Sequence, residues 1–274
     1  MPVLVASDLD RTLIYSCAAL ALTMPDARAP RLLCVEVHES MPLSYLTETA
    51  AGLLTELADA AVFVPTTTRT RRQYLRINLP GPTPTYAICA NGGHLLVDGV
   101  SDPDWHASVL ARLADECASL DEVQDHLLTA ADPVWVRKHR VADDLFAYLV
   151  VERELLPEEW VKELAVWAEN RGWTVSLQGR KIYAVPKPLT KSAAVREVAR
   201  RTGADLTLAA GDSSSTPTSC SPRTGAGGPA TANWPTAAGP LPTSPSSPSV
   251  AYWRANASCG SSCGRRGSAR SAGE

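Results

Sequence analysis

Two aspartates directly behind a short apolar run constrain this chain more than any other feature of its sequence. Val3-Leu4-Val5-Ala6 carries no charge, and Asp8-Leu9-Asp10-Arg11-Thr12 follows it. A short run rich in valine predicts a buried strand of a parallel sheet. Side chains at the carboxyl end of such a strand enter the crevice in which open α/β sheets bind ligands. We therefore expect Asp8 and Asp10 to meet at a binding site, although an aspartate pair that caps a helix or solvates a turn would read the same way.

Two carboxylates placed in this way suit the chemistry of a phosphate ester. One carboxylate can attack phosphorus, and the other can move the proton. A divalent cation would offset the repulsion between the two carboxylates and the negative charge of the phosphate. The pair therefore predicts a cation-dependent phosphoryl site at the end of the first strand.

Composition limits the class of protein and of partner. The 274 residues suffice for one large domain or two small ones, and 45% of them are hydrophobic. The net charge of −3 argues against nucleic acid or an anionic membrane as the main partner, and no apolar run is long enough to cross a bilayer. Since the first residues lack a basic region and enter a strand at once, we expect no signal peptide and a cytoplasmic protein. Reduced, buried thiols are expected at Cys17, Cys34, Cys89 and Cys117.

Strand and helix patterns alternate along the chain and then change character in its middle. A second buried strand is expected at 61–64, and further strands are expected at 86–90 and 206–210. Helices are expected at 44–60, with Ser44 or Thr47 as the cap, and at 191–202. The middle of the chain predicts helices at 103–126 and 157–170, antiparallel strands over 133–151 and a hairpin over 173–185. This order indicates an α/β protein, with a Rossmann-like parallel-sheet core and an inserted α+β cap.

Three more strand or helix ends carry residues that suit the same chemistry. Thr67 lies within Val64-Pro65-Thr66-Thr67-Thr68-Arg69, at the end of an apolar strand, with Thr66 as the competing register. Lys191 lies at the start of a helix, and Gly211-Asp212 follows the last strand. In this order, together with Asp8 and Asp10, these residues resemble the four motifs of the haloacid dehalogenase (HAD) superfamily of phosphohydrolases.

The placement of the insertion refines the resemblance. It falls between the second and third motifs, and the segment Ala90-Asn91-Gly92-Gly93 adds to the likeness. Both features are similar to the members with a large type IIB cap, which include sucrose-phosphate and mannosyl-phosphoglycerate phosphatases. The resemblance covers about residues 1–213.

The resemblance implies a role for each motif residue. Asp8 would attack phosphorus and form an aspartyl-phosphate, and Asp10 would protonate the leaving alcohol and then deprotonate the attacking water. Thr67 would donate a hydrogen bond to a phosphoryl oxygen, and Lys191 would neutralise charge on Asp8 and the transferring group. Asp8, the backbone carbonyl of Asp10 and Asp212 would hold Mg²⁺ through oxygen ligands.

Residues beside the motifs are further candidates for substrate binding. We expect Thr66, Arg69, Asn91 and Gly92 to lie near the substrate. Ordinary structural roles remain open for several residues: Asn91-Gly92 reads equally as a hairpin turn, and Thr67 as a turn residue at a strand end. Lys191 could be a solvated lysine, although the start of a helix is an unfavourable place for a cation.

Charged residues of the cap allow two interpretations. The stretches 137–140 and 180–181 are basic and could meet an anionic or polyhydroxyl substrate. Polar faces of a sheet would show the same pattern.

The expected domains are a core of residues 1–98 plus 183–213, a cap of residues 99–182 and a low-complexity tail of residues 214–274. In the fourth motif a second acid would belong at position 216, where this chain has Thr216. The tail that follows is rich in Ser, Thr, Pro, Gly and Ala, a composition typical of disorder.

A shift of reading frame near codon 213 is a sharper hypothesis for the tail. If the gene is GC-rich, reading one base earlier turns the residues from Ser213 onward into S-V-L-D-A-D-L-L-L-A-A-D-R-G-W. It also turns residues 248–263 into P-E-R-G-V-L-A-G-E-R-I-L-R-Q-L-L. The first string restores an acid at position 216, and the second has the pattern of an amphipathic helix.

The function expected from these motifs is magnesium-dependent hydrolysis of a small phosphorylated metabolite, such as a sugar phosphate. A phosphomutase uses similar residues but retains the phosphoryl group, so release of free phosphate separates the two activities. A catalytically impaired protein that binds phosphorylated ligands is the alternative from another class, and Thr216 favours it.

Restoring the reading frame is expected to increase phosphatase activity. The chain as written lacks one acid of the metal site, so we expect weak magnesium binding and little turnover. Hydrolysis of p-nitrophenyl phosphate by the frame-restored and the original chain measures the difference. An intact reading frame on resequencing, or no gain of activity on restoration, would contradict the hypothesis.

Overall fold

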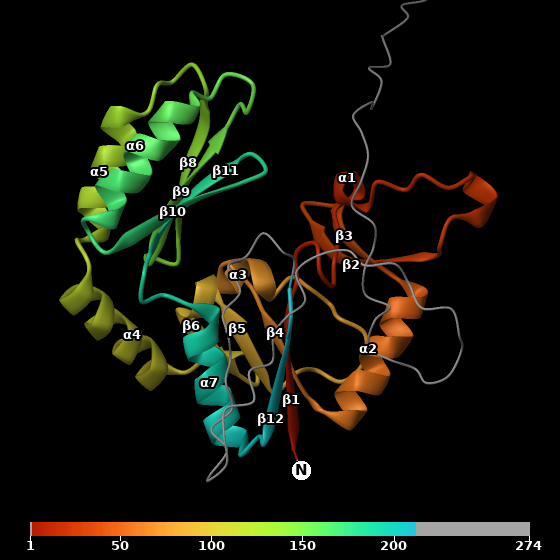
Figure 1. Cartoon of the computed structure of the whole chain (residues 1–274). Helices are drawn as coiled ribbons and strands as arrows, with labels where there is room; N and C mark the ends of the chain where they lie inside the picture. Colours follow the sequence, from red (N-terminus) through yellow and green to blue (C-terminus); the bar gives the residue numbers. More distant parts are fainter. Residues whose placement is uncertain (1, 212–274) are drawn as a thin grey trace, which may run out of the picture.

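The core of the molecule is a mostly parallel sheet, seen in a computed structural model that describes residues 2–211 (Figure 1). Its strand order is β12-β1-β4-β5-β6-β7. The four parallel strands are β12 (Leu206–Ala210), β1 (Val3–Asp8), β4 (Val62–Thr66) and β5 (Tyr86–Cys89). The antiparallel edge is formed by β6 (His94–Val97) and β7 (Val100–Ser101). The carboxyl ends of the parallel strands therefore meet along one edge of the sheet.

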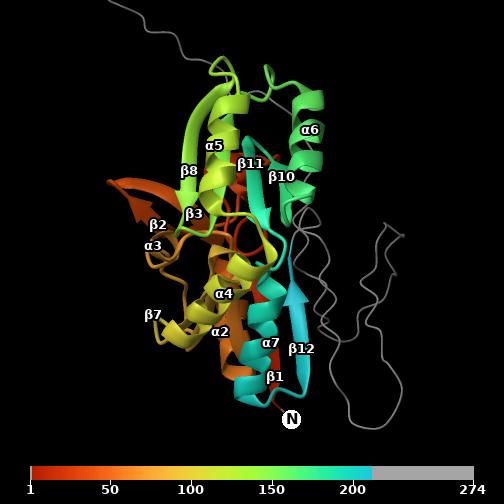
Figure 2. The same cartoon turned by 90° about the vertical axis from the view of Figure 1, so that its left-hand side faces the viewer.

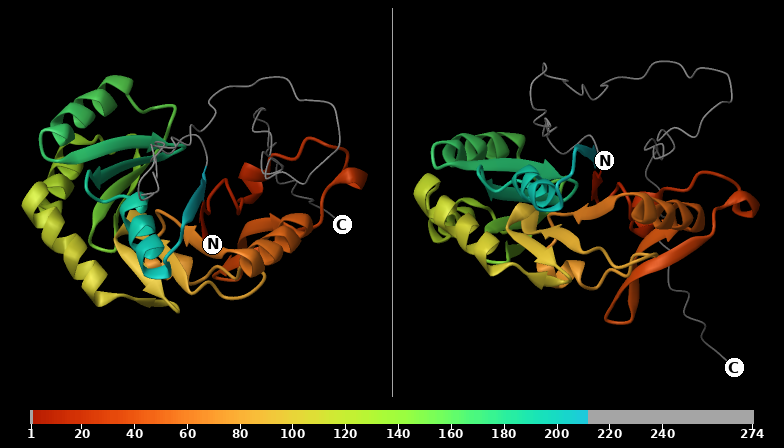
Figure 3. Two further views of the ribbon diagram at one scale, coloured as in Figure 1. Left: turned by 60° about the horizontal axis from the view of Figure 1, so that its bottom comes forward. Right: turned by 90° about the horizontal axis from the view of Figure 1, so that it is seen from below.

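Helices cover both faces of this sheet (Figure 3). On one face α7 (Lys191–Thr202) and α4 (Pro103–Glu116) pack on apolar side chains of the strands, among them Leu4, Val64 and Ile88. On the other face α2 (Glu48–Ala60) packs with Leu9, Leu46 and Phe63. Because both faces are covered there, β1, β4 and β5 are mainly apolar and buried, as the uncharged runs in the sequence predicted, whereas Leu206 and Leu208 of β12 are exposed.

A two-stranded hairpin stands beside the carboxyl edge of the sheet (Figure 1). It consists of β2 (Leu32–His38) and β3 (Met41–Thr47), and short turns of helix lie at α1 (Cys17–Leu20), η1 (Asp26–Arg28) and α3 (Arg71–Tyr74). The prediction that a helix begins near Ser44 was wrong, since Ser44 belongs to β3 and the helix begins only at Glu48. Thr47, the other predicted cap, accepts a hydrogen bond from the Ala50 amide and does cap α2.

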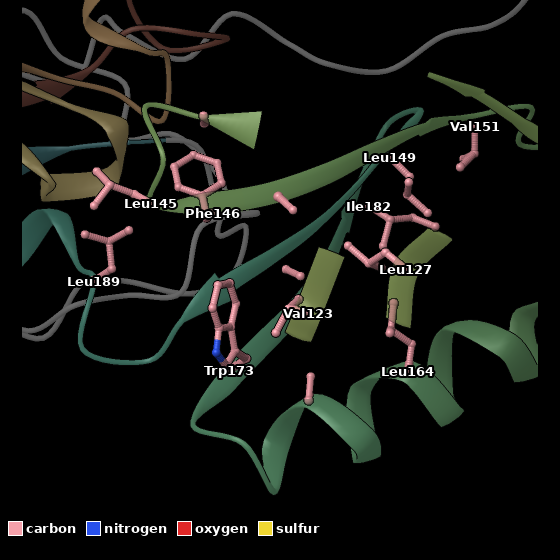
Figure 4. Packing of buried hydrophobic residues seen from close by; sticks show 14 of the residues in the cluster. Val123, Leu127, Leu145, Phe146, Leu149, Val151, Leu164, Trp173, Ile182 and Leu189 are labelled. Carbon is pink, nitrogen blue, oxygen red and sulfur yellow. The ribbon is translucent and has the colours of Figure 1, made fainter. Parts of the chain in front are cut away.

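The residues between α4 and α7 form a second, antiparallel sheet with the order β10-β11-β9-β8. Its strands are β8 (Val136–Ala142), β9 (Phe146–Val151), β10 (Trp173–Gln178) and β11 (Lys181–Pro186). Two helices, α5 (Leu120–Ala130) and α6 (Glu158–Glu169), cover one face of it (Figure 2). Figure 4 shows the apolar layer between this sheet and its helices, in which Trp173, Phe146 and Leu127 are buried. This unit is called the cap below.

The α/β class, the parallel core and the separate antiparallel cap sheet are confirmed. The single helix expected at 103–126 is instead two helices. The chain breaks between them because Ser119 caps α5 and the Ala118 amide donates to the carbonyl of Arg171. The predicted boundary at residue 182 falls inside β11, which pairs with β10 as far as Pro186. The predicted division into core and cap otherwise stays a prediction.

The structure also tests two smaller predictions from the sequence, the burial of four cysteines and the absence of a membrane span. Cys89 is buried and Cys117 partly so, but Cys17 and Cys34 are exposed, so the expectation of buried thiols was wrong for those two. All four are free thiols. Within residues 2–211, no helix has the length and apolar character needed to span a bilayer.

Candidate active site

Asp8 and Lys191 meet at the carboxyl edge of the core sheet. Asp8 is the last residue of β1, and the Nζ atom of Lys191 lies 2.9 Å from its Oδ1 atom. The Leu9 amide donates a second hydrogen bond to the same oxygen at 2.8 Å. Within the described part of the chain, no group donates a hydrogen bond to Oδ2. Burial raises the pKa of the Asp8 carboxyl, and Lys191 counters that rise.

The place of Lys191 depends on contacts made by two residues predicted to bind substrate. Lys191 is the first residue of α7, which Thr190 caps. The Asn91 side chain donates to the carbonyl of Leu189 at 2.7 Å. Gly92 has a φ of +102°, and a β-carbon there would collide with the backbone carbonyl of Thr190. Asn91 and Gly92 thus hold the segment that leads to Lys191, and a contact of either with substrate stays a prediction.

The two threonine registers have different geometry. Thr66 ends β4 directly opposite Asp8 in the parallel pairing of β1 and β4, and it is buried. Thr67 is completely buried, and its Oγ1 accepts a hydrogen bond from the Arg69 amide at 3.1 Å. Both hydroxyls therefore lie at the same edge as Asp8. The choice between them as the phosphoryl ligand stays open.

Asp10 is held by Arg69, from the loop after β4. The chain turns tightly after Asp10, with Arg11 in a left-handed conformation at a φ of 62°. The carboxylate of Asp10 accepts two hydrogen bonds from Arg69, from Nε at 2.9 Å and from Nη2 at 2.8 Å. This two-point contact is the strong form of a carboxylate–guanidinium pair. Arg69, predicted to contact substrate, therefore has the Asp10 carboxylate as its direct partner in this structure.

Sequence reasoning missed Glu36, which lies behind Arg69. The Glu36 carboxylate accepts a hydrogen bond from Ser44 at 2.6 Å, from Arg69 Nη1 at 2.7 Å and from Arg76 at 3.1 Å. Burial alone would raise the pKa of Glu36, but the hydrogen bonds from Ser44 and Arg69 hold it below its usual value. The contacts with Asp10 and Glu36 also raise the pKa of Arg69, which stays cationic despite its burial. A charged residue in an otherwise apolar strand run was the only signal in the sequence.

The described residues supply part of the expected metal site. Residues 2–211 contain no cluster of three His, Cys, Asp or Glu side chains placed to hold an ion. The oxygens of Asp8 and Asp10 are hard ligands of the kind that Mg²⁺ takes. The third expected ligand, Asp212, lies outside the described residues, as do Thr216 and the predicted tail.

The cap contributes side chains from β11. Burial raises the pKa of the Tyr183 hydroxyl, and the side chain of Thr68, next to the second motif, counters that rise. Desolvation lowers the pKa of Lys181, which also interacts electrostatically with Asp10 and Arg69. Lys181 lies over the rings of Tyr148 and Tyr183, at 5.4 Å and 5.9 Å from their centroids. A basic and aromatic face of the cap sheet is thereby turned toward the site.

Comparison with known proteins gives structural matches only. No family model and no curated protein sequence matches the chain. A sucrose-phosphatase from Synechocystis sp. PCC6803, in complex with sucrose and phosphate, is 15% identical, with a TM-score of 0.48 over 78% of this chain and 76% of that one. The C-terminal domain of a trehalose-6-phosphate phosphatase from C. albicans is 15% identical, with a TM-score of 0.45 over 77% and 70%.

A third match is a phosphatase of the HAD enzyme superfamily from Bacteroides thetaiotaomicron. It is 15% identical, with a TM-score of 0.40 over 77% of this chain and 78% of that one.

Replacing Gly92 by alanine is expected to destabilise the protein and to displace Lys191. The added β-carbon would push against the carbonyl of Thr190, which should cost about 2 kcal/mol beyond the strain of the positive φ. Gly99 is the matched control, because its φ is +80° and a β-carbon added there would meet no atom within 4 Å. Urea denaturation compares Gly92→Ala with Gly99→Ala, and equal losses of stability would contradict the proposed collision.

The stability of the protein is expected to fall in acid partly through Glu36. Because its pKa is lower in the folded state, its contribution is complete above the ordinary glutamate pKa of about 4.3 and is lost as the pH falls through the folded pKa. The fall in the free energy of unfolding between about pH 5 and pH 3 should therefore be smaller in Glu36→Gln than in the wild type. The exposed residue Glu56 provides the control Glu56→Gln, and identical acid profiles for all three proteins would refute this assignment.

Proposed function

We propose that the protein is a magnesium-dependent phosphomonoester hydrolase that acts on a small phosphorylated metabolite, such as a sugar phosphate, through an aspartyl-phosphate. The observation that carries this proposal is the 2.9 Å contact between Asp8 and Lys191. These two residues lie at opposite ends of the described sequence, yet they meet at the edge where parallel sheets bind ligands. A nucleophilic carboxylate beside a lysine is the arrangement that phosphoryl transfer to Asp8 requires.

The reaction proceeds in two steps, formation of the aspartyl-phosphate and its hydrolysis. Asp8 attacks phosphorus, the bond from phosphorus to the ester oxygen breaks, and Asp10, which enters this step in its protonated form, gives its proton to the departing alcohol. Asp10 then takes a proton from a water molecule, which attacks the aspartyl-phosphate and releases phosphate and free Asp8. Lys191 offsets the charge that Asp8 and the phosphoryl group bring together. Thr67, or Thr66 in the other register, donates a hydrogen bond to a phosphoryl oxygen.

Magnesium would be held by Asp8, the backbone carbonyl of Asp10 and Asp212. When bound, the ion would neutralise charge on the phosphate and on both carboxylates. Because Lys191 pairs with Asp8 and Arg69 with Asp10, Lys181 alone of the cations named at this site is left to offset the charge of an entering phosphate. This charge balance supports a requirement for a divalent cation.

The cap supports a small, polar substrate. Lys181 offers a cation, and Tyr148 and Tyr183 offer ring faces and hydroxyl groups on the side of the cap that faces Asp10. Aromatic faces beside hydrogen-bonding groups suit a polyhydroxyl leaving group. The sugar-phosphate class is proposed on these contacts together with the sequence motifs.

A second candidate is a protein that binds phosphorylated ligands without turning them over. The observation that favours it is Thr216, which stands where the fourth motif would have an acid. Such a protein would be stabilised by inorganic phosphate or a sugar phosphate and would release no product.

Phosphate release is expected to require magnesium, Asp8 and Lys191. The original and the frame-restored chains are assayed with p-nitrophenyl phosphate and with a panel of sugar phosphates. Asp8→Asn should abolish turnover, and Lys191→Met should lower kcat by at least about 100-fold because the charge beside the nucleophile is lost. Asp59→Asn, at an exposed position of α2, is the control and should act as the wild type does.

The other outcomes of this assay distinguish the alternatives to a phosphatase with Asp8 as its nucleophile. Activity that survives in Asp8→Asn would contradict the proposed nucleophile. Transfer of the phosphoryl group within the substrate, without free phosphate, would identify a mutase. Thermal stabilisation by phosphate without any product, in the frame-restored chain as well, would favour the binding protein.

A further inference from the structure

Glu36 is a buried charge that the proposed mechanism does not use. It is 2% exposed, and it comes from β2 of the hairpin rather than from the core sheet. Burying a carboxylate is unfavourable unless it is paired, and an apolar side chain at such a place is often at least as stabilising. The hairpin therefore carries a cost at this position that packing alone does not explain.

The backbone of β2 turns Glu36 inward. In a regular strand alternate side chains face opposite sides, yet Val35 and Glu36 are neighbours and both are buried. The pairing of β2 with β3 shifts register on both sides of Glu36. A β-bulge of this kind redirects a side chain, and bulges occur often beside active sites. Glu36 also forms an isolated bridge with Ile77, in the segment after α3 that carries Arg76.

Arg69 connects Glu36 to Asp10 through a planar group. Its Nη1 atom binds Glu36 at 2.7 Å, while Nε and Nη2 bind Asp10. Ser44 contacts both side chains of this pair. Its hydroxyl donates a hydrogen bond to Glu36 at 2.6 Å and accepts one from Arg69 Nη2 at 3.2 Å. The guanidinium is rigid, so fixing one edge at Glu36 sets the direction of the edge that faces Asp10.

Asp10 depends on this contact for its orientation. Its side chain is 49% exposed, and within residues 2–211 Arg69 is the one group that donates hydrogen bonds to it. Arg76 places a second guanidinium on Glu36 at 3.1 Å, so the two carboxylates and two guanidiniums balance in charge. Arg69 can therefore pair with Asp10 while Arg76 keeps the Glu36 carboxylate paired.

We propose that Glu36 is a positioning residue: by binding Arg69 it fixes the carboxylate of Asp10 for proton transfer, so that the β2–β3 hairpin helps to set the catalytic geometry. This inference rests on the proposed function, in which Asp10 protonates the leaving alcohol. Its consequence is specific to the leaving group. An alkoxide needs a proton from Asp10, whereas p-nitrophenolate is stable enough to leave without one.

The test compares kcat/KM of Glu36→Gln for glycerol 2-phosphate and for p-nitrophenyl phosphate, in the full chain and its frame-restored form. This parameter reports the formation of the aspartyl-phosphate, which is the step that needs the acid. We expect a fall of about 10- to 100-fold for glycerol 2-phosphate and of less than about threefold for p-nitrophenyl phosphate. Arg69→Lys, which keeps the charge but lacks the planar fork, should show the same dependence on the leaving group.

The controls separate positioning from loss of structure. Glu56→Gln makes the same chemical change on the exposed side of α2 and should alter neither value. If Glu36→Gln does not fold, Ser44→Ala takes its place, because it removes the hydroxyl that binds both Glu36 and Arg69. Equal falls for the two substrates, or no fall for either, would overturn the proposal.

A measurement without turnover distinguishes failure of this inference from failure of the proposed function. The Nε–H proton of Arg69, assigned by its loss in Arg69→Lys, is observed by ¹⁵N NMR. We expect its exchange with water to be at least about tenfold faster in Glu36→Gln, because the guanidinium is no longer held against Asp10. If the wild type hydrolyses neither ester, the proposed function fails and this exchange rate decides whether Glu36 positions Arg69; unchanged exchange refutes it.

Discussion

The parallel register of β1 between β12 and β4 is the constraint on which the rest of the structure depends. It places Asp8 at the same edge as Thr66 and brings the start of α7 close enough for Lys191 to reach the carboxylate. A carboxylate buried at a sheet edge is costly without a cation nearby. The ion pair therefore joins the first strand of the core to the helix that follows the cap, and the stability of the edge and its proposed chemistry rest on the same contact.

Each carboxylate at this edge has its own cation, and the cations come from different parts of the chain. Lys191, from α7, forms an ion pair with Asp8, and Arg69, from the loop after β4, forms an ion pair with Asp10. Glu36 and Arg76 extend the second pair into the hairpin, while Lys181 approaches from the cap. Distant segments thus share one electrostatic arrangement, which is the physical basis of the influence that we propose for the hairpin on proton transfer at Asp10.

The sequence predicted local features well where one physical signal was strong. Apolar runs located the parallel strands of the core, and Gly203, at a φ of 62°, ends α7 where the sequence placed the end of that helix. It failed where two signals competed. Ser44 reads as a helix cap because serine favours caps, but pairing with β2 extends the strand to Thr47. The helix expected at 103–126 is broken because Ala118 pairs with Arg171, a contact that no local pattern reveals.

The sequence by itself determined which residues are candidates for the chemistry, since a carboxylate pair after an apolar strand, a threonine after the next and a lysine at a helix start follow from local patterns. It could not assign Arg69, Asn91, Gly92 or Glu36 to their contacts. Those contacts join residues far apart in the chain, and local periodicity carries no information about such distances. Only the tertiary structure, through a bulge in β2 and the close approach of Gly92 to Thr190, decided that Glu36 is turned inward and that Asn91 and Gly92 hold the segment before Lys191.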